Sequence, residues 1–224
     1  DKMINYNFYY WGPLLFKTKL PEEVLQKIKK LCKKDSNKTY VQHLAGDIKE
    51  EYEIDKKEID NIIKPYINTF REAFLNWYGS SIGELYAREA WVNYMKPGDY
   101  NPVHIHRDCE FSSVLYVDVP EELQKEMESF KGRGKGPGSI SFLYGEESYY
   151  ATTWYDFRPE VGDFYIFPWA LRHYVHPYKS KCERISVAIN FGVRSVTSEL
   201  LKKIMGEKEK NEDEEYLEEL KEKL

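Results

Sequence analysis

Residues in two distant parts of the chain are suited to binding a metal ion. His106 and Asp108 are separated by one residue, and His173 lies far downstream. Two imidazoles and one carboxylate suit non-haem Fe(II), because this ligand set leaves coordination positions open for a cosubstrate and O₂. Arg184 follows His173 by eleven positions (184 − 173), so a returning strand could bring its guanidinium into the same pocket. A guanidinium is a natural partner for a carboxylate at the floor of a pocket.

Four of the five histidines lie in two short clusters. The first cluster holds His104 and His106 together with Asp108, and the second holds His173 and His176. In a strand, residues two apart share a face, so all three members of the first cluster could point one way. His173 and His176 are three apart and would face oppositely in extended structure. We predict His173 as the ligand, because His176 precedes a proline and is expected to lead away from the site.

The surrounding sequence predicts helices followed by short strands. Apolar residues recur at helical spacing from about Lys56 to Tyr78, and Gly79 ends this segment. A shorter helix is predicted after Pro21, with acidic residues in its first turn. The predicted strands are Leu85–Tyr94, Phe111–Val119, Ser139–Tyr144, Tyr149–Trp154, Asp163–Phe167, His173–Val175 and Arg184–Phe191. Many short strands separated by turn residues favour a sandwich, a barrel or a jelly roll.

The composition predicts one globular domain. The chain has 224 residues, of which 42% are hydrophobic and 16% aromatic, and no Ser/Gly-rich linker divides it. We expect one domain over residues 1–205, with helical support at about 20–80, and a charged C-terminal helix or tail over residues 206–224. This last segment holds nine acidic and four basic residues, which matches the formal net charge of −5 of the whole chain. The remainder is therefore near neutral, which argues against a broad nucleic-acid-binding surface.

Cysteine usage and hydropathy bear on the cellular compartment. Cys32, Cys109 and Cys182 are the three cysteines, and they form no CxxC motif, which suits a reducing compartment. No signal peptide is visible and no stretch approaches the length needed to span a membrane. We therefore expect a soluble, cytoplasmic protein without a membrane partner. The sequence indicates neither the oligomeric state nor the primary substrate.

Several motifs together resemble the 2-oxoglutarate- and Fe(II)-dependent oxygenase superfamily. Within it, the closest resemblance is to the small bacterial and phage branch related to prolyl hydroxylases. The motifs are NYMKPGD at 93–99, HIHRD at 104–108, SSVLYV at 112–117, GDFYIFPWALRHYVHP at 162–177 and RISVAINF at 184–191. The resemblance covers about Leu85–Val193. It implies a mainly β fold with N-terminal helices, namely a double-stranded β-helix, which is a cupin-like jelly roll.

This resemblance also implies an activity. Members of the superfamily bind Fe(II), use 2-oxoglutarate and O₂ as cosubstrates, and hydroxylate a substrate with release of succinate and CO₂. The implied metal ligands are His106, Asp108 and His173. Arg184 matches the basic residue that binds the distal carboxylate of 2-oxoglutarate. Ser186, on the same strand face, and Tyr116 are expected to contact that carboxylate too.

Alternatives remain open for the ligands and for the function. Members of the closest branch often read HxH, so His104 and His106 could both bind the metal, with Asp108 beside them. The domain could instead be a catalytically silent β-helix that binds a ligand or partner, which the complete set of predicted ligands disfavours. It could also be a cupin-like metalloenzyme that does not use 2-oxoglutarate, which Arg184 disfavours. For an oxygenase, the substrate could be a peptide, a protein side chain or a small molecule.

Overall fold

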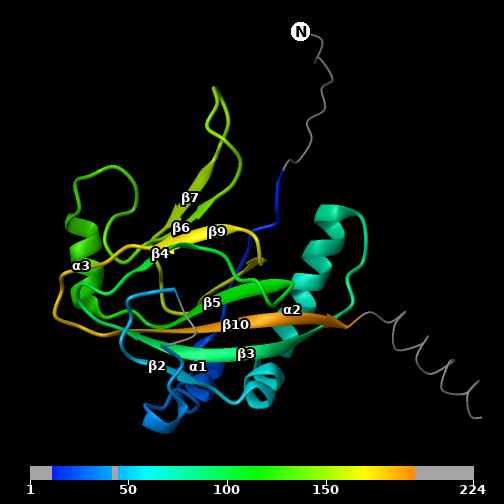
Figure 1. The fold of residues 1–224 in the computed structure, drawn as a ribbon, viewed down its shortest axis with the longest axis horizontal. Coiled ribbons are helices and arrows are strands. Elements are labelled where there is room, and N and C mark those ends of the chain that lie inside the picture. Colours follow the sequence, from blue (N-terminus) through cyan, green and yellow to red (C-terminus); the bar gives the residue numbers. More distant parts are fainter. Residues whose placement is uncertain (1–11, 42–44, 195–224) are drawn as a thin grey trace, which may run out of the picture.

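Two antiparallel β-sheets face each other in the computed structural model, which describes residues 12–41 and 45–194 (Figure 1). The large sheet has the order β1 (Phe16–Lys19), β8 (Asp163–Pro168), β5 (Phe111–Asp118), β10 (Arg184–Arg194), β3 (Glu84–Met95) and β2 (Glu51–Glu53). The small sheet has the order β4 (Asn101–His104), β9 (Arg172–Val175), β6 (Ile140–Leu143) and β7 (Trp154–Phe157). This arrangement confirms the predicted mainly β fold, a double-stranded β-helix.

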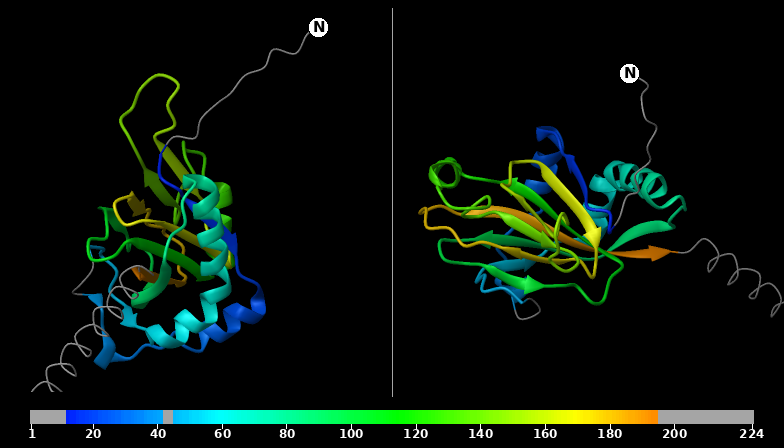
Figure 2. Two further views of the ribbon diagram at one scale, coloured as in Figure 1. Left: turned by 90° about the vertical axis from the view of Figure 1, so that its right-hand side faces the viewer. Right: turned by 90° about the horizontal axis from the view of Figure 1, so that it is seen from above.

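Two helices cover the outer face of the large sheet, as Figure 2 shows. The helices of the described residues are α1 (Glu22–Lys29), α2 (Lys56–Tyr78) and α3 (Glu121–Ser129), and Ser36–Lys38 form a short 3₁₀ helix, η1. The predicted bounds of α2 are confirmed, and its caps explain them. The Asp55 carboxylate accepts hydrogen bonds from the backbone N–H groups of Lys57 and Glu58, and Gly79 ends the helix with a φ of 70°.

The first hydrophobic core lies between these helices and the large sheet. The buried side chains of α2 are Ile59, Ile63, Ile67 and Phe70, which recur at helical spacing. The Phe70 ring makes edge contacts with Phe16 and Phe111, at centroid distances of 5.5 and 5.1 Å. Full burial of such a side chain stabilises the fold by about 1.5–3 kcal/mol. The large sheet is therefore held rigidly from its outer side.

The inner face of the large sheet has a different character. Along β10, Val187 and Ile189 point to the helices, whereas Ser186, Ala188 and Asn190 alternate with them and line a cavity between the sheets. A second hydrophobic cluster closes the rest of the space between the sheets. Its largest members include Tyr116, Phe142, Tyr165, Phe167 and Tyr178. Polar side chains on an otherwise apolar inner face mark the part of the fold that is open to a ligand.

Some local predictions were wrong. The predicted strand Tyr149–Trp154 is displaced, because β7 begins only at Trp154. Tyr149 and Tyr150 lie in an exposed turn, and Tyr150 has a φ of 63°. The aromatic residues led to the prediction of a strand, but a residue with positive φ interrupts strand geometry. The sequence also gave no prediction of β2, β4 or α3, which are short or rich in charged residues.

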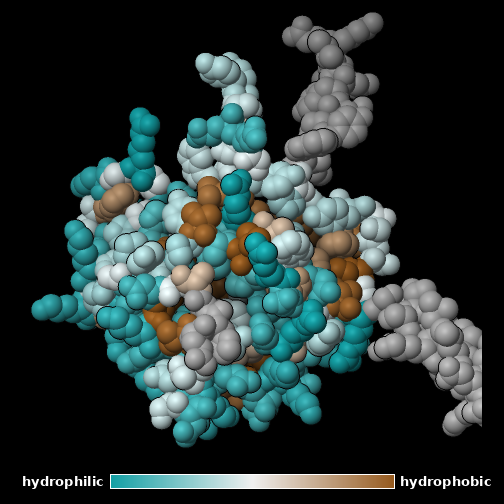
Figure 3. All heavy atoms as spheres, in the orientation of Figure 1, coloured by the Kyte–Doolittle hydropathy of each residue, from teal (hydrophilic) through white to brown (hydrophobic). Residues whose placement is uncertain are grey.

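Hydrophilic residues dominate the face seen in Figure 3, and hydrophobic residues appear there in separate spots. No helix in the described part of the chain is both long and apolar enough to cross a membrane. The predicted helix Thr197–Met205 and the charged segment Gly206–Leu224 lie outside the described residues.

Candidate metal and cosubstrate site

The candidate site is a cavity of about 310 Å³ between the two sheets. Inner-face residues of β3, β5 and β10 form its floor, and residues of β4, β9 and the loop after β4 form its other wall. Every residue that the sequence predicted for the site lines it, namely His104, His106, Asp108, Tyr116, His173, Arg184 and Ser186. The fold therefore brings segments from across the chain to one cavity.

Three histidines meet in this cavity. His104 ends β4 and lies opposite His173 of the neighbouring β9, and His106 follows in the adjoining loop. One ligand atom from each lies within 4.8 Å of the others. The Nε2 atoms of His106 and His173 are 3.2 Å apart. Two nitrogens bound at right angles to one ion at about 2.1 Å lie about 3 Å apart, so this spacing suits a shared metal.

Backbone carbonyls orient two of the rings. His104 Nδ1 lies 2.7 Å from the Pro102 oxygen, and His173 Nδ1 lies 2.9 Å from the Leu171 oxygen. A ring nitrogen that faces a carbonyl oxygen must carry the proton and donate it. Nε2 of each ring is then left with a free lone pair for a metal, and metal-binding histidines are commonly oriented in this way by a hydrogen bond from the other ring nitrogen.

The histidines are electrically neutral at ordinary pH. Burial lowers the pKa of His106 to about 3, and the adjacent His104 adds to this effect. Burial, followed by the charges of the other two histidines, holds the pKa of His173 well below its usual range. Burial also lowers the pKa of His104. Because metals bind neutral imidazole, the cavity presents the three rings in the required form.

Asp108 does not join this group of ligand atoms. Strand β4 ends at His104, and the backbone N–H of His106 donates to the Trp169 oxygen at 3.1 Å. The alternation of a strand, on which the prediction that three residues face one way depended, therefore stops before Asp108. Its side chain lines the cavity but is exposed, and its carboxylate lies outside the three-histidine group.

The second histidine cluster divides as its spacing predicted. His173 points into the cavity between the sheets and is 4% exposed. His176 lines a separate pocket beside the loop before β6, and its Nε2 lies 3.3 Å from the Ser141 hydroxyl. The two side chains therefore lie in different pockets.

Arg184 lines the same cavity and is 2% exposed. Its Nη1 donates to the Gly138 oxygen at 2.8 Å, its Nη2 lies 2.9 Å from the Met95 sulfur, and its guanidinium lies 5.1 Å from the Tyr116 ring centre. Arg184 Nε and the Tyr116 hydroxyl are buried without hydrogen-bond partners. Buried polar groups are normally paired, so these two donors fit an anionic ligand such as a carboxylate.

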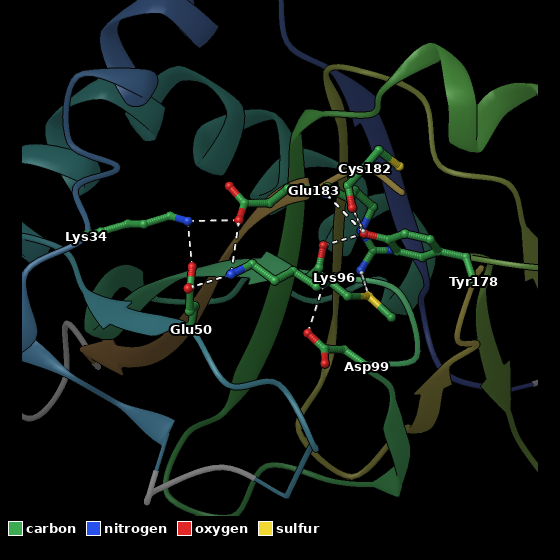
Figure 4. Close-up of polar contacts among 9 residues, drawn as sticks. Lys34, Glu50, Lys96, Asp99, Tyr178, Cys182 and Glu183 are labelled. Carbon is green, nitrogen blue, oxygen red and sulfur yellow. Dashed lines mark hydrogen bonds and ion pairs between the residues drawn. The ribbon is translucent and has the colours of Figure 1, made fainter. Parts of the chain in front are cut away.

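Tyr178 fixes the backbone that carries Arg184 (Figure 4). Its hydroxyl donates to the Met95 carbonyl and accepts from the Arg184 backbone N–H at 3.3 Å. Burial raises the pKa of Tyr178 to about 12, so the hydroxyl keeps its proton. Because the same hydroxyl contacts the end of β3 and the start of β10, the guanidinium enters the cavity from a fixed position.

Charged side chains reinforce this junction on the outside. Lys34 pairs with Glu50 at 2.5 Å and with Glu183 at 2.8 Å, and Lys96 pairs with Glu50 at 2.6 Å (Figure 4). This network connects the residues just before β2 and β10 with the turn after β3 and the segment after α1. These pairs are partly exposed, so each adds little stability, but together they link four chain segments.

The sequence identified only two members of one row of cavity residues, Tyr116 and Ser186, and missed Asn93 and Glu51. Register places Tyr116 opposite Ser186, Ser186 opposite Asn93, and Asn93 opposite Glu51, across four adjacent strands. All four line the cavity and are buried. Alternation within β3 could have indicated Asn93. Glu51 gave no signal, because a glutamate in a short charged segment is normally exposed.

Comparison with known proteins agrees with this geometry. Residues 89–190 match a sequence family described as "Putative 2OG-Fe(II) oxygenase". The chain is similar in structure to a Pseudomonas putida prolyl-4-hydroxylase, with a TM-score of 0.53 and 16% identity over 81% of this chain and 93% of that chain. It is also similar to a viral collagen prolyl hydroxylase from Paramecium Bursaria Chlorella virus-1, solved with 2OG, with a TM-score of 0.50 and 18% identity over 79% of this chain and 94% of that chain.

Comparison with curated proteins gives no match. At such low identities the two solved structures establish the fold. Together with the family match, they confirm the resemblance to the oxygenase superfamily and the double-stranded β-helix.

Proposed function

We propose that this chain, which matches the 2OG-Fe(II) oxygenase family over residues 89–190, is an Fe(II)- and 2-oxoglutarate-dependent dioxygenase. It would hydroxylate a peptide, a protein side chain or a small molecule and release succinate and CO₂. One observation carries the proposal. A buried arginine with an unpaired donor shares a cavity with three neutral histidines whose ligand atoms converge.

Arg184 would hold the distal carboxylate of 2-oxoglutarate. Its free Nε–H and the free Tyr116 hydroxyl are the two donors without partners, and the Ser186 hydroxyl lies beside Tyr116 in register. A charge-assisted contact to a guanidinium in a dry cavity is strong and directional. This cluster therefore supports binding of a dicarboxylate through the carboxylate that is remote from the metal.

His104, His106 and His173 would hold the iron in this proposal. When bound, the iron would supply the activation of O₂ that couples decarboxylation of 2-oxoglutarate to hydroxylation. The chain itself orients the rings through the two backbone carbonyls. It also excludes water on one side, where the Phe167 and Phe142 rings lie 4.7 and 5.9 Å from the His173 ring.

This ligand set is the alternative that the sequence left open, rather than the first choice of His106, Asp108 and His173. The convergence of one ligand atom from each of the three histidines supports it, whereas the Asp108 side chain is exposed. Imidazole is a suitable ligand for iron, so three imidazoles remain compatible with the proposed metal.

Product formation tests the proposed function. The full-length protein, incubated aerobically with Fe(II) and 2-oxoglutarate, should form succinate slowly without a primary substrate. Omission of Fe(II) should abolish succinate formation. Calorimetry on the Mn(II)-loaded protein should show 2-oxoglutarate binding. Neither succinate nor 2-oxoglutarate binding in a folded, metal-loaded sample would refute the proposal.

A further inference from the structure

Glu51 is a buried acid that the proposed chemistry does not use. It belongs to β2 and is 1% exposed, and it lines the same cavity as the three histidines. Its Oε2 atom has no hydrogen-bond partner. The preceding residue, Glu50, shows the ordinary arrangement, since it faces outward and pairs with Lys34 and Lys96. Of these two adjacent glutamates, Glu50 therefore forms ion pairs on the outside, whereas Glu51 is buried without one among the described residues.

The surroundings of Glu51 are acidic. Burial, followed by the charge of Asp99, raises the pKa of Glu51 to about 8. Asp99 is itself buried, and its carboxylate accepts from the Lys96 backbone N–H at 2.9 Å. Within the described residues no basic side chain forms an ion pair with Glu51, because Lys34 and Lys96 pair with Glu50 and Glu183. A buried acid beside a second acid either keeps its proton or ionises when a cation joins them.

Arg184 does not supply that cation. It lies opposite Met95 on β10, whereas Glu51 lies opposite Asn93 on the far side of β3. The guanidinium instead contacts the Gly138 carbonyl and the Met95 sulfur. The acidic part of the cavity is thus separate from the part proposed for 2-oxoglutarate.

Aromatic and acidic side chains line the same cavity. The rings of Tyr40 and Trp91 stack with centroids 5.1 Å apart, and both residues line the cavity. Glu89 and Asp108 also line it. Flat aromatic faces next to carboxylates favour an ammonium or guanidinium group and disfavour an anion.

We infer that Glu51 determines substrate specificity by receiving a cationic group of the primary substrate, either a guanidinium or a primary ammonium. The inference rests on the proposed function, because it places this substrate in the cavity of the oxygenase. A cation beside Glu51 would stabilise the ionised form of a carboxyl group with which no other described residue forms an ion pair. The expected substrate class is therefore a basic side chain or a small amine, with its reacting carbon held between Glu51 and the histidines.

A pair of probes that differ in charge but hardly in shape tests this inference. The probes are n-butylguanidinium and n-butylurea, titrated by calorimetry into the full-length protein, both without metal and with Mn(II) and 2-oxoglutarate. We expect wild type to bind the guanidinium at least about tenfold more tightly than the urea, since a desolvated ion pair is worth at least this factor. Glu51→Gln should remove this preference while keeping the size of the side chain.

Glu53→Gln provides the matched control. Glu53 lies two residues further along β2, is exposed and does not line the cavity, so its variant should keep the preference. Equal affinity of wild type for both probes, no binding of either probe at 10 mM (roughly the millimolar limit of weak binding), or an unchanged preference in Glu51→Gln would each overturn the inference. The comparison of the two probes on wild type does not depend on the folding of any variant.

The outcome also separates this inference from the proposed function. Guanidinium binding to the metal-free protein through Glu51, without any binding of 2-oxoglutarate, would support the cation site and refute the oxygenase. Binding of 2-oxoglutarate without a preference for the cationic probe would support the oxygenase and refute the cation site.

Discussion

The cavity holds two buried ionisable groups of opposite kind, a guanidinium and a carboxyl group, and neither forms an ion pair within the described residues. At one end Arg184 is buried against a carbonyl, a sulfur and the Tyr116 ring, with its Nε free. At the other end Glu51 is buried beside Asp99, with its Oε2 free. Buried charges in proteins are usually paired with each other. The fold instead keeps these two apart on β10 and β2, so each end is available to a ligand of opposite charge.

The difference between the Arg184 and Glu51 parts of the cavity would orient a ligand bound there. A dicarboxylate is attracted to the Arg184 end and finds no positive group at the Glu51 end among the described residues. A cationic substrate shows the reverse preference. The three histidines lie within the same cavity, so the two ligands can approach a metal there without competing for one charged partner.

Removal of a metal ligand should have the largest effect. His104→Ala should lower Mn(II) affinity by more than about 100-fold, because even outer-shell contacts contribute 10–100-fold. Asp108→Ala should keep affinity within about threefold, a change below the tenfold that 1.4 kcal/mol represents. Titration with Mn(II), followed by electron paramagnetic resonance, measures both. If Asp108→Ala loses the metal and His104→Ala keeps it, the ligand set first predicted from the sequence is the right one.

The Arg184 end should show the next largest effect. Arg184→Ala should raise the dissociation constant of 2-oxoglutarate by about thirtyfold or more, since truncating one partner of a buried charged pair costs about 2–5 kcal/mol. Calorimetry on the Mn(II)-loaded protein measures this change. Arg194→Ala is the control, because Arg194 ends the same strand and stacks on Tyr86 outside the cavity. Unchanged affinity in Arg184→Ala would mean that Arg184 does not bind the distal carboxylate of 2-oxoglutarate.

Glu51 should affect how the stability of the protein depends on pH. The pKa of Glu51 is raised from 4.5 to about 8 in the folded protein, so the folded state keeps a proton that the unfolded state releases. The contribution of Glu51 to stability is therefore present below pH 4.5 and is lost as pH rises towards 8. Without a ligand, Glu51→Gln should gain about 3–4 kcal/mol over wild type between pH 5 and pH 8, since each pH unit between the two pKa values costs about 1.4 kcal/mol.

Urea unfolding at several pH values measures that difference. Glu53→Gln, in the same strand but exposed, should show no such trend. A constant difference between Glu51→Gln and wild type across this pH range would mean that Glu51 is not an isolated buried acid.

The sequence predicted the framework well because the framework follows local rules. The apolar spacing and the Gly79 cap define α2, and alternation with turn residues defines most strands. Resemblance to the superfamily identified Arg184 and His173, which line the cavity. The exact faces of residues after β4 could not be predicted, because alternation ends with the strand at His104.

Glu51 shows a second limit of sequence reasoning. Its burial depends on where a three-residue strand pairs with β3, and register between segments forty residues apart leaves no local signature. Composition predicts an exposed glutamate, as holds for Glu53 but not for Glu51. Residues that break such a rule are more often functional, and only the assembled sheet reveals them.

Crystals grown with Mn(II) and 2-oxoglutarate would test the central claim most directly, which is that the cavity binds metal and cosubstrate from the Arg184 side. We expect the ion at the Nε2 atoms of His104, His106 and His173, and the distal carboxylate of 2-oxoglutarate at Arg184 Nε and the Tyr116 hydroxyl. Electron density for 2-oxoglutarate beside Glu51, or a metal held elsewhere while these three histidines remain free, would contradict the account.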